Sequence, residues 1–187
     1  MNRDSEFYKG LIGLAGKDRR MQLSLDEAIE DHDNFISSTM SEIDRQIFLL
    51  GALASKHSDC FWAACDSVKE DKDKENYTYI GTRVRHHNGS LQMEWFKNNI
   101  VLVKKTGKKQ TFSGHLAKGK GFRYPSDLFK KEPKWARETI RQVEDGYENI
   151  RKRVALLSNI KRDLKTYNSL AKKDFALSAG VSQDDET

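Results

Sequence analysis

The fold is decided between residues 77 and 115, which read YTYIGTRVRHHNGSLQMEWFKNNIVLVKKTGKKQTFSGH. In this stretch Leu91, Met93 and Trp95 alternate with polar residues, as expected for a β-strand with one buried face. Asn88-Gly89 is the turn sequence typical of a tight β-hairpin. The stretch therefore predicts antiparallel strands joined by short turns.

Two further turns would divide the remainder of this stretch. Asn98-Asn99 is one candidate, and the very basic segment 104–109 is the other. Between them, residues 100–103 are apolar on both faces and predict a central strand. With a last strand at 110–115, the sequence predicts a four-stranded antiparallel β-meander, which belongs to a basic sheet module over residues 77–124.

The residues before the sheet follow a helical period. Apolar side chains recur every three or four positions, with His32 in the one gap, and Ser24 is a suitable N-cap before Asp26 and Glu27. We therefore predict a long helix within residues 21–70. The apolar seam comprises Leu25, Ile29, Ile36, Met40, Ile43, Ile47, Leu50 and Ala54.

A second helical period follows the sheet, in the predicted helical region 125–178. Pro133 suits the first turn of this helix. Its seam comprises Trp135, Ile140, Val143, Tyr147, Ile150, Val154, Leu157, Ile160, Leu164 and Tyr167. We expect a flexible arm at 1–20 and a disordered tail at 179–187.

Together these segments predict an α+β fold in which two long antiparallel, coiled-coil-like helices flank the sheet. Phe61, Trp62, Phe129 and Trp135 lie at the helix ends nearest the sheet and could cover its apolar face. The seams alone do not distinguish helices that pair within one chain from helices that pair between two chains.

Charge is distributed unevenly along the chain. The 187 residues carry a formal charge of +5, but residues 1–76 carry −6, residues 77–134 carry +10 and residues 135–187 carry +1. A basic middle between two less basic flanks predicts a polyanionic partner, with nucleic acid first. The alternative interpretation is a basic solubilising surface.

Ten basic residues of the middle segment are the predicted nucleic-acid contacts. Lysines in turns suit the phosphate backbone, and arginines suit base edges or bidentate phosphate contacts. The ten residues are Arg83, Arg85, Lys97, Lys104, Lys105, Lys108, Lys109, Lys118, Lys120 and Arg123. Among the aromatic residues, Trp95 lies on the same strand face as Leu91 and Met93 and is expected to pack in the core. Phe96 lies on the opposite face and is the better candidate for stacking on bases.

We expect neither a metal site nor a catalytic site. His86 and His87 are adjacent in a strand and would point to opposite faces, so they would not converge with His115 and Glu94 on one metal ion. Cys60 and Cys65 lie about 140° apart around a helix, which favours buried thiols over a zinc pair. No cofactor motif is present, because the Gly-Lys pattern at 118–121 lacks the spacing of a P-loop.

Nothing in the composition predicts a membrane or an oxidising compartment. No run of 18 apolar residues occurs, and two cysteines make no disulfide framework. The first six residues, Met-Asn-Arg-Asp-Ser-Glu, do not resemble a secretory signal. We therefore expect a cytoplasmic protein with no membrane partner.

The sequence resembles the MobI-type conjugative transfer proteins, which are auxiliary factors of integrative conjugative elements and related plasmids. The resemblance covers residues 77–155. It rests on the strand 91–96 with its tryptophan, the basic turn, the segment 114–124, and the helix 135–153 with Glu144, Glu148, Arg151 and Arg153. It implies a protein without enzymatic activity that recognises an origin of transfer and assists the nicking by a relaxase.

Three functions remain open from the sequence. The first is a DNA-binding accessory protein of conjugation that binds double-stranded DNA, with a relaxase or other transfer proteins as partners and a possible homodimer. The second is a helical protein–protein adaptor whose basic sheet binds an acidic partner. The third, which we expect least, is a metal-dependent nuclease that uses His86, His87, His115 and Glu94.

Overall fold

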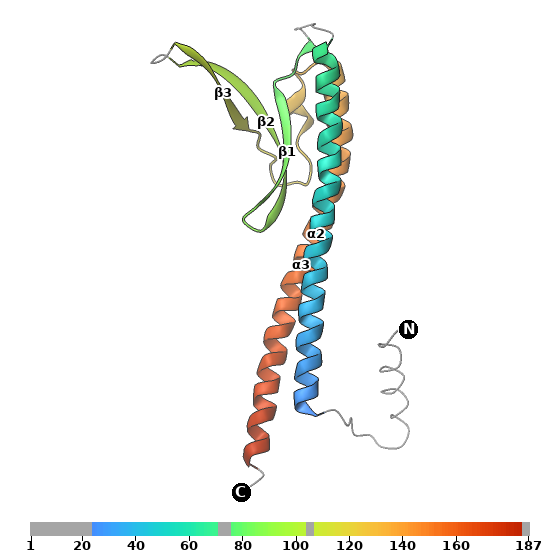
Figure 1. Ribbon diagram of the computed structural model, residues 1–187, viewed down its shortest axis with the longest axis vertical. Helices are drawn as coiled ribbons and strands as arrows, with labels where there is room; N and C mark the ends of the chain where they lie inside the picture. Colours follow the sequence, from blue (N-terminus) through green and yellow to red (C-terminus); the bar gives the residue numbers. More distant parts are fainter. Residues whose placement is uncertain (1–23, 71–75, 104–106, 185–187) are drawn as a thin grey trace. The chain divides into compact units, whose positions relative to one another are not determined.

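The computed structural model describes residues 24–70, 76–103 and 107–184, without the side chains of 181–184. Helix α2 (Leu25–Glu70) precedes the strands β1 (Ile80–His87), β2 (Ser90–Val103) and β3 (Lys108–His115). The short 3-10 helix η2 (Ser126–Phe129) and helix α3 (Lys134–Asp184) follow (Figure 1). The predicted α+β class and the order helix, sheet, helix are confirmed.

The chain divides into two compact units. A sheet-bearing unit comprises residues 41–163, and a helical unit comprises the residues up to 40 and from 164 onward. The predicted arm at 1–20 lies outside the described residues. Helix α3 continues to Asp184, so residues 179–184 are helical where the sequence predicted a disordered tail.

Ser24 is the N-cap of helix α2, as the sequence predicts, and it forms a capping box with Glu27. The Ser24 hydroxyl accepts a hydrogen bond from the Glu27 backbone N–H at 3.2 Å, and the Glu27 carboxylate accepts one from the Ser24 N–H at 2.9 Å. The Ser24 N–H and the Ser24 hydroxyl both donate to the Glu27 carboxylate, and these two hydrogen bonds lower the pKa of Glu27. The reciprocal bonds satisfy two backbone donors that have no partner inside the helix.

The sheet has three strands in the order β1-β2-β3, so the predicted count of four is wrong. The Asn88-Gly89 hairpin is confirmed, with φ angles of 49° and 71° that suit a tight turn. The predicted turn at Asn98-Asn99 does not form. There β2 changes its hydrogen-bonding partner instead, because β1 pairs with it only as far as Lys97 while β3 pairs with it from Phe96 onward.

The burial predicted for residues 100–103 is also wrong. These residues belong to β2, but Ile100, Val101 and Leu102 are each about half exposed, at 56 %, 47 % and 59 %. No strand or helix covers either face of this end of β2 among the described residues, since all eight residues of its partner β3 are exposed as well. The apolar run at residues 100–103 therefore lies in an exposed end of β2 and not at the centre of the core.

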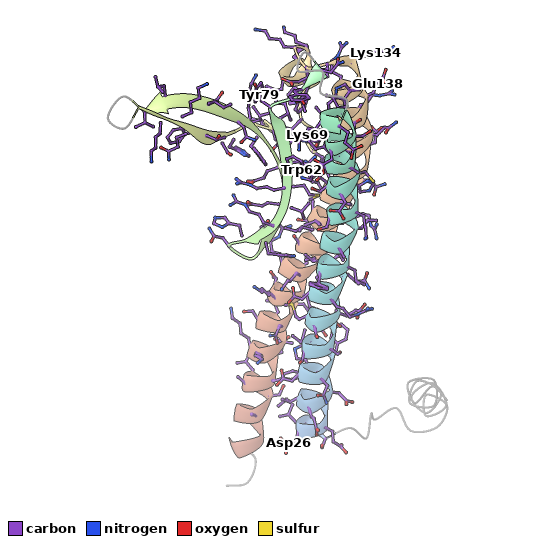
Figure 2. The ribbon with its side chains drawn as sticks, turned by 45° about the horizontal axis from the view of Figure 1, so that its top comes forward. Asp26, Trp62, Lys69, Tyr79, Lys134 and Glu138 are labelled. Carbon is purple, nitrogen blue, oxygen red and sulfur yellow. The ribbon has the colours of Figure 1, made fainter. Side chains whose placement is uncertain are left out.

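The core lies where the other half of the sheet meets the helices. Trp95 of β2 is fully buried, as its parity predicts, and its ring contacts Phe61 of α2 and Phe129 of η2 at centroid distances of 5.0 and 5.6 Å. Trp62 points from α2 toward β1 (Figure 2), where its indole N–H donates to the Thr82 carbonyl at 3.2 Å. The aromatic cover predicted for the sheet is thus confirmed for these residues.

Within the sheet-bearing unit, α2 and α3 pack against each other in antiparallel directions. His57 meets Tyr147 at a ring distance of 6.3 Å, while Asp44 reaches Lys161 at 2.5 Å. Both seams contribute to the same core, but Ile160 is half exposed. The helices of this unit therefore pair within one chain.

The helical unit has a small contact cluster of its own around His32. This histidine is buried, as its place in the seam predicts, and its Nε2 lies 3.0 Å from the Asn168 side-chain oxygen. Tyr167 and Phe175 pack on its ring at 5.3 and 5.4 Å. Asp33 and Lys172 form an ion pair at 3.6 Å nearby. Here too the helices run antiparallel.

Gly81 makes a close approach that a larger residue would disturb. It lies opposite Phe96 in the sheet, and a Cβ at residue 81 would come within 2.4 Å of the Phe96 ring and 3.0 Å of Trp62. We expect Gly81→Val to lower the free energy of unfolding by about 1–3 kcal/mol, despite the better strand propensity of valine. Urea denaturation measures this change.

Gly114→Val is the matched control, because it places the same side chain on β3, where the nearest atoms lie 3.6 Å away. We expect this variant to be neutral or slightly stabilising. Equal losses in the two variants would contradict the close approach at Gly81.

Candidate nucleic-acid interface

The most distinctive exposed element is a two-stranded β-ribbon, which we define as residues 98–103 of β2 and 108–113 of β3. It lies beyond the reach of β1, whose pairing with β2 ends at Lys97. Figure 1 shows β2 and β3 extending together away from the helices of the same unit. The ribbon exists because β2, at 14 residues, is much longer than β1, at 8.

Both faces of the β-ribbon carry apolar side chains and hydrogen-bonding groups. Residues opposite each other share a face, so Ile100 lies with Thr111 on one face, and Val101 lies with Gln110 on the other. Phe112, which is 49 % exposed, lies on the second face. Thr111 and Gln110 are exposed as well, so each face offers polar groups to a partner.

Lysines lie at the far end of the β-ribbon. Lys108 and Lys109 are exposed at the start of β3, opposite Val103 and Leu102. Because adjacent strand residues point to opposite faces, each face of the ribbon receives one of these two lysines. Lys104 and Lys105, which the sequence places in the same turn, lie outside the described residues.

Arg83 and Arg85 of β1 converge on one carboxylate. Arg83 Nε donates to Glu94 Oε2 at 2.7 Å, and Arg85 donates to Glu94 Oε1 at 3.1 Å. Burial raises the pKa of Glu94, but the hydrogen bonds from the two arginines outweigh it and lower the pKa overall. Both arginine side chains remain about two-fifths exposed, so they keep donors for a further acceptor.

Phe96 is not free for stacking in the way the sequence predicts. It is partly buried, and the Arg83 guanidinium lies over its ring at 5.6 Å from the centroid. This cation–π contact occupies one face of the ring.

Lys97 and Arg123 already bind carboxylates of the fold. Lys97 lies 3.8 Å from Glu132, whose carboxylate also accepts from Thr78 at 2.7 Å. Arg123 binds Asp145 at 2.6 Å and Glu148 at 3.2 Å, and these hydrogen bonds raise its pKa although its burial lowers it. Both residues therefore have structural partners that sequence reasoning did not anticipate.

The basic loop before η2 holds the last two predicted contacts. Lys118 is partly buried and donates to the Gly121 carbonyl, and this burial lowers its pKa. Lys120 is exposed in the same loop. Of the two, Lys120 is the more accessible to a ligand.

The histidines do not gather in the described part of the chain. His115 Nδ1 lies 3.9 Å from Glu94 Oε1, but no group of three or more His, Cys, Asp or Glu residues is positioned to hold a metal ion there. Cys65 is buried as expected, and burial raises its pKa to about 11, whereas Cys60 is exposed.

A buried ion pair that sequence reasoning did not find holds the sheet to α3. The Glu144 carboxylate accepts from Trp95 Nε1 at 2.6 Å and from the Tyr124 backbone N–H at 2.9 Å. Arg151 donates to both of its oxygens at 3.1 and 3.2 Å and also to the carbonyl of Met93. The pair could have been predicted from the sequence by the spacing of seven residues between Glu144 and Arg151, because this spacing puts both side chains on one helix face.

Comparison with models of protein families shows to which family this chain belongs. The family model described as MobI protein matches residues 50–165, which is more than half of the sequence. The chain belongs to the MobI family. Neither the search of curated proteins nor that of solved structures gave a match.

The MobI match contains the whole sheet, the β-ribbon and the buried Glu144–Arg151 pair. It confirms the resemblance predicted for residues 77–155 and extends it back into α2 and further along α3. Membership supports a role in conjugative mobilization. Of the helix residues on which the resemblance rests, Glu144 and Arg151 are buried, Glu148 binds Arg123 and Lys152, and Arg153 is exposed.

Among the described residues of this MobI protein, neither long helix contains an apolar stretch of the length that a membrane span requires.

Proposed function

We propose that this MobI protein is a DNA-binding accessory factor without enzymatic activity, which binds double-stranded DNA at an origin of transfer. The observation that carries the proposal is the exposed β-ribbon with lysines at its far end. The major groove of B-DNA, about 12 Å wide, admits a two-stranded β-ribbon. An element of this shape is otherwise difficult to explain, because an uncovered ribbon is marginally stable by itself.

The roles of the ribbon residues follow from their chemistry. Lys108 and Lys109 would contact phosphates on either side of the groove, since they point to opposite faces. Gln110 would contact base edges, because an exposed glutamine can bind adenine through two hydrogen bonds. Its apolar neighbour Val101 lies on the same face and would meet thymine methyl groups.

The remaining predicted contacts would extend the interface outside the ribbon. Arg83 and Arg85 have donors that Glu94 does not use, and Lys120 is exposed in its loop. Lys97, Lys118 and Arg123 are weaker candidates, because each already has a partner in the fold.

A relaxase, other transfer proteins or a second copy of the chain would use the helices. In the sheet-bearing unit, Phe48, Leu49 and Leu53 of α2 are exposed, as are Leu156 and Ile160 of α3. Exposed apolar side chains on a helix are typical of a docking surface for another protein. The same observation favours the second candidate function, an adaptor whose basic sheet binds an acidic protein.

Titration of labelled duplex DNA with the full chain at several salt concentrations tests the proposal. We expect tighter binding to the transfer-origin duplex than to a random duplex. The variant Lys108→Gln/Lys109→Gln should weaken binding to both duplexes and reduce the slope of log K against log salt by about 2. Gln110→Ala should reduce the preference for the origin and leave the salt slope unchanged.

Lys165→Gln/Lys173→Gln is the matched control, since it removes two exposed lysines from α3 outside the sheet-bearing unit. Its DNA binding should equal that of the unmodified protein. The proposal is wrong if the two double variants bind DNA equally well. Weak and equal binding to both duplexes would favour the adaptor.

A further inference from the structure

A second basic feature lies apart from the β-ribbon, in a pocket between η2 and the start of α3. The pocket encloses about 320 Å³. Figure 2 labels Lys134 and Glu138, which mark the first turns of α3 where the pocket begins. Its charged lining comprises Arg123, Asp127, Lys130, Arg137, Arg141 and Glu144.

Three of these cations have no side-chain partner among the described residues. Arg123 binds Asp145 and Glu148, and Glu144 is bound by Arg151. In contrast, Lys130, Arg137 and Arg141 form no side-chain hydrogen bond or ion pair with any described residue. Set against Asp127, these three cations leave the pocket with two uncompensated positive charges.

The geometry directs these cations toward one volume. Arg137 and Arg141 are four residues apart, so they project from the same face of α3. Lys130 reaches the pocket from the segment that follows η2. The floor is formed by the buried side chains of Tyr124, Phe129 and Ile140.

The charged lining has a net positive charge and lies over an apolar floor, which strengthens the field that acts on an anion. Low-dielectric walls focus the electrostatic potential of such an excess charge. A phosphate group fits such a pocket better than a carboxylate does, because it offers more acceptor oxygens to two arginine forks and carries up to two negative charges.

We infer that the pocket between η2 and α3 is a binding site for a phosphate group, with Arg137 and Arg141 as its principal ligands. The phosphate could belong to a DNA backbone or to a free phosphate compound. Both offer anionic phosphoryl oxygens to the arginines, and only the free compound carries more than one negative charge per phosphate. This inference does not depend on the DNA-binding role of the β-ribbon.

Titration of the ¹⁵N-labelled full chain with pyrophosphate at constant ionic strength tests the inference. The Nε–H resonances of Arg137 and Arg141 should shift and saturate. The variant Arg137→Gln/Arg141→Gln should raise the dissociation constant for pyrophosphate by about tenfold or more, because two charge-assisted contacts are lost. Both side chains are exposed at their helix positions, so the variant should fold normally.

Arg153→Gln/Arg162→Gln is the matched control, since it removes two exposed arginines of α3 that do not line the pocket. It should bind pyrophosphate as tightly as the unmodified protein. The inference is overturned if no resonance saturates, if the two double variants bind equally, or if malonate binds as tightly as pyrophosphate.

The duplex titration then identifies the source of the phosphate. If Arg137→Gln/Arg141→Gln reduces the salt slope by about 2, a DNA backbone supplies it. If pyrophosphate binding is lost while duplex binding is unchanged, a free phosphate compound supplies it. Failure of the duplex to bind at all would count against the proposed function and leave the phosphate site standing.

Discussion

Replacement of Arg151 by methionine should lower the free energy of unfolding by about 3–5 kcal/mol. The guanidinium donates to the Glu144 carboxylate and to the carbonyls of Phe122 and Met93, at distances between 2.6 and 3.2 Å. Arg151→Met would leave a buried carboxylate without its counter-charge, since Glu144 is only 2 % exposed. Urea denaturation followed by circular dichroism measures the loss.

Arg153→Met is the control for this prediction, because Arg153 lies two residues further along α3 and is exposed. It should change the stability by no more than about 0.5 kcal/mol. The double variant Glu144→Gln/Arg151→Met should recover part of the loss, because it removes the buried charge as well. If Arg151→Met costs no more than Arg153→Met, the buried pair does not hold the sheet to α3.

Trp95→Ala should cost about 3–5 kcal/mol as well, for a different reason. The indole is completely buried between Phe61 and Phe129, so its removal opens a cavity among rings that pack edge to face. The variant also removes the N–H that donates to Glu144 at 2.6 Å. Thermal and urea denaturation should both show the loss.

Trp95→Phe separates the two contributions. It keeps part of the aromatic packing and removes the hydrogen bond to the carboxylate, so we expect a smaller loss of about 1.5–3 kcal/mol. Phe48→Ala is the control for the loss of an aromatic ring, because Phe48 is 67 % exposed, and it should have little effect. A loss after Phe48→Ala as large as that after Trp95→Ala would contradict the assignment of the core.

The two stability predictions and the DNA experiment concern different parts of one unit. Arg151 and Trp95 lie in the core, whereas Lys108 and Lys109 lie on an exposed strand. Variants of the ribbon should therefore change DNA binding without changing stability. This separation allows the proposed function to be tested in a fully folded protein.

Local signals in the sequence predicted much of the secondary structure. Ser24 as N-cap, the Asn88-Gly89 hairpin and the burial of His32 and Trp95 are all confirmed. Each of these features depends on residues close together in the chain, through hydrogen bonds in one turn or through a regular period. Such short-range patterns can be recognised without knowledge of the fold.

The distribution of charge along the chain could also be read from the sequence, but the partner that each charged side chain binds could not. Composition placed the excess of lysine and arginine in residues 77–134. It did not reveal that Arg123 binds Asp145 and Glu148, since these partners lie 22 and 25 residues away. Nor did it reveal that Lys97 meets Glu132.

The α+β class, the two helices, the first hairpin and the basic character of the middle segment could all be predicted from the order of the residues. The folded chain was needed to show that β2 continues through Asn98-Asn99, that residues 100–102 are exposed, and that Glu144 and Arg151 meet in the core. A period or a turn is set by neighbouring residues, whereas strand pairing, burial and ion pairs depend on residues that only the folded chain brings together.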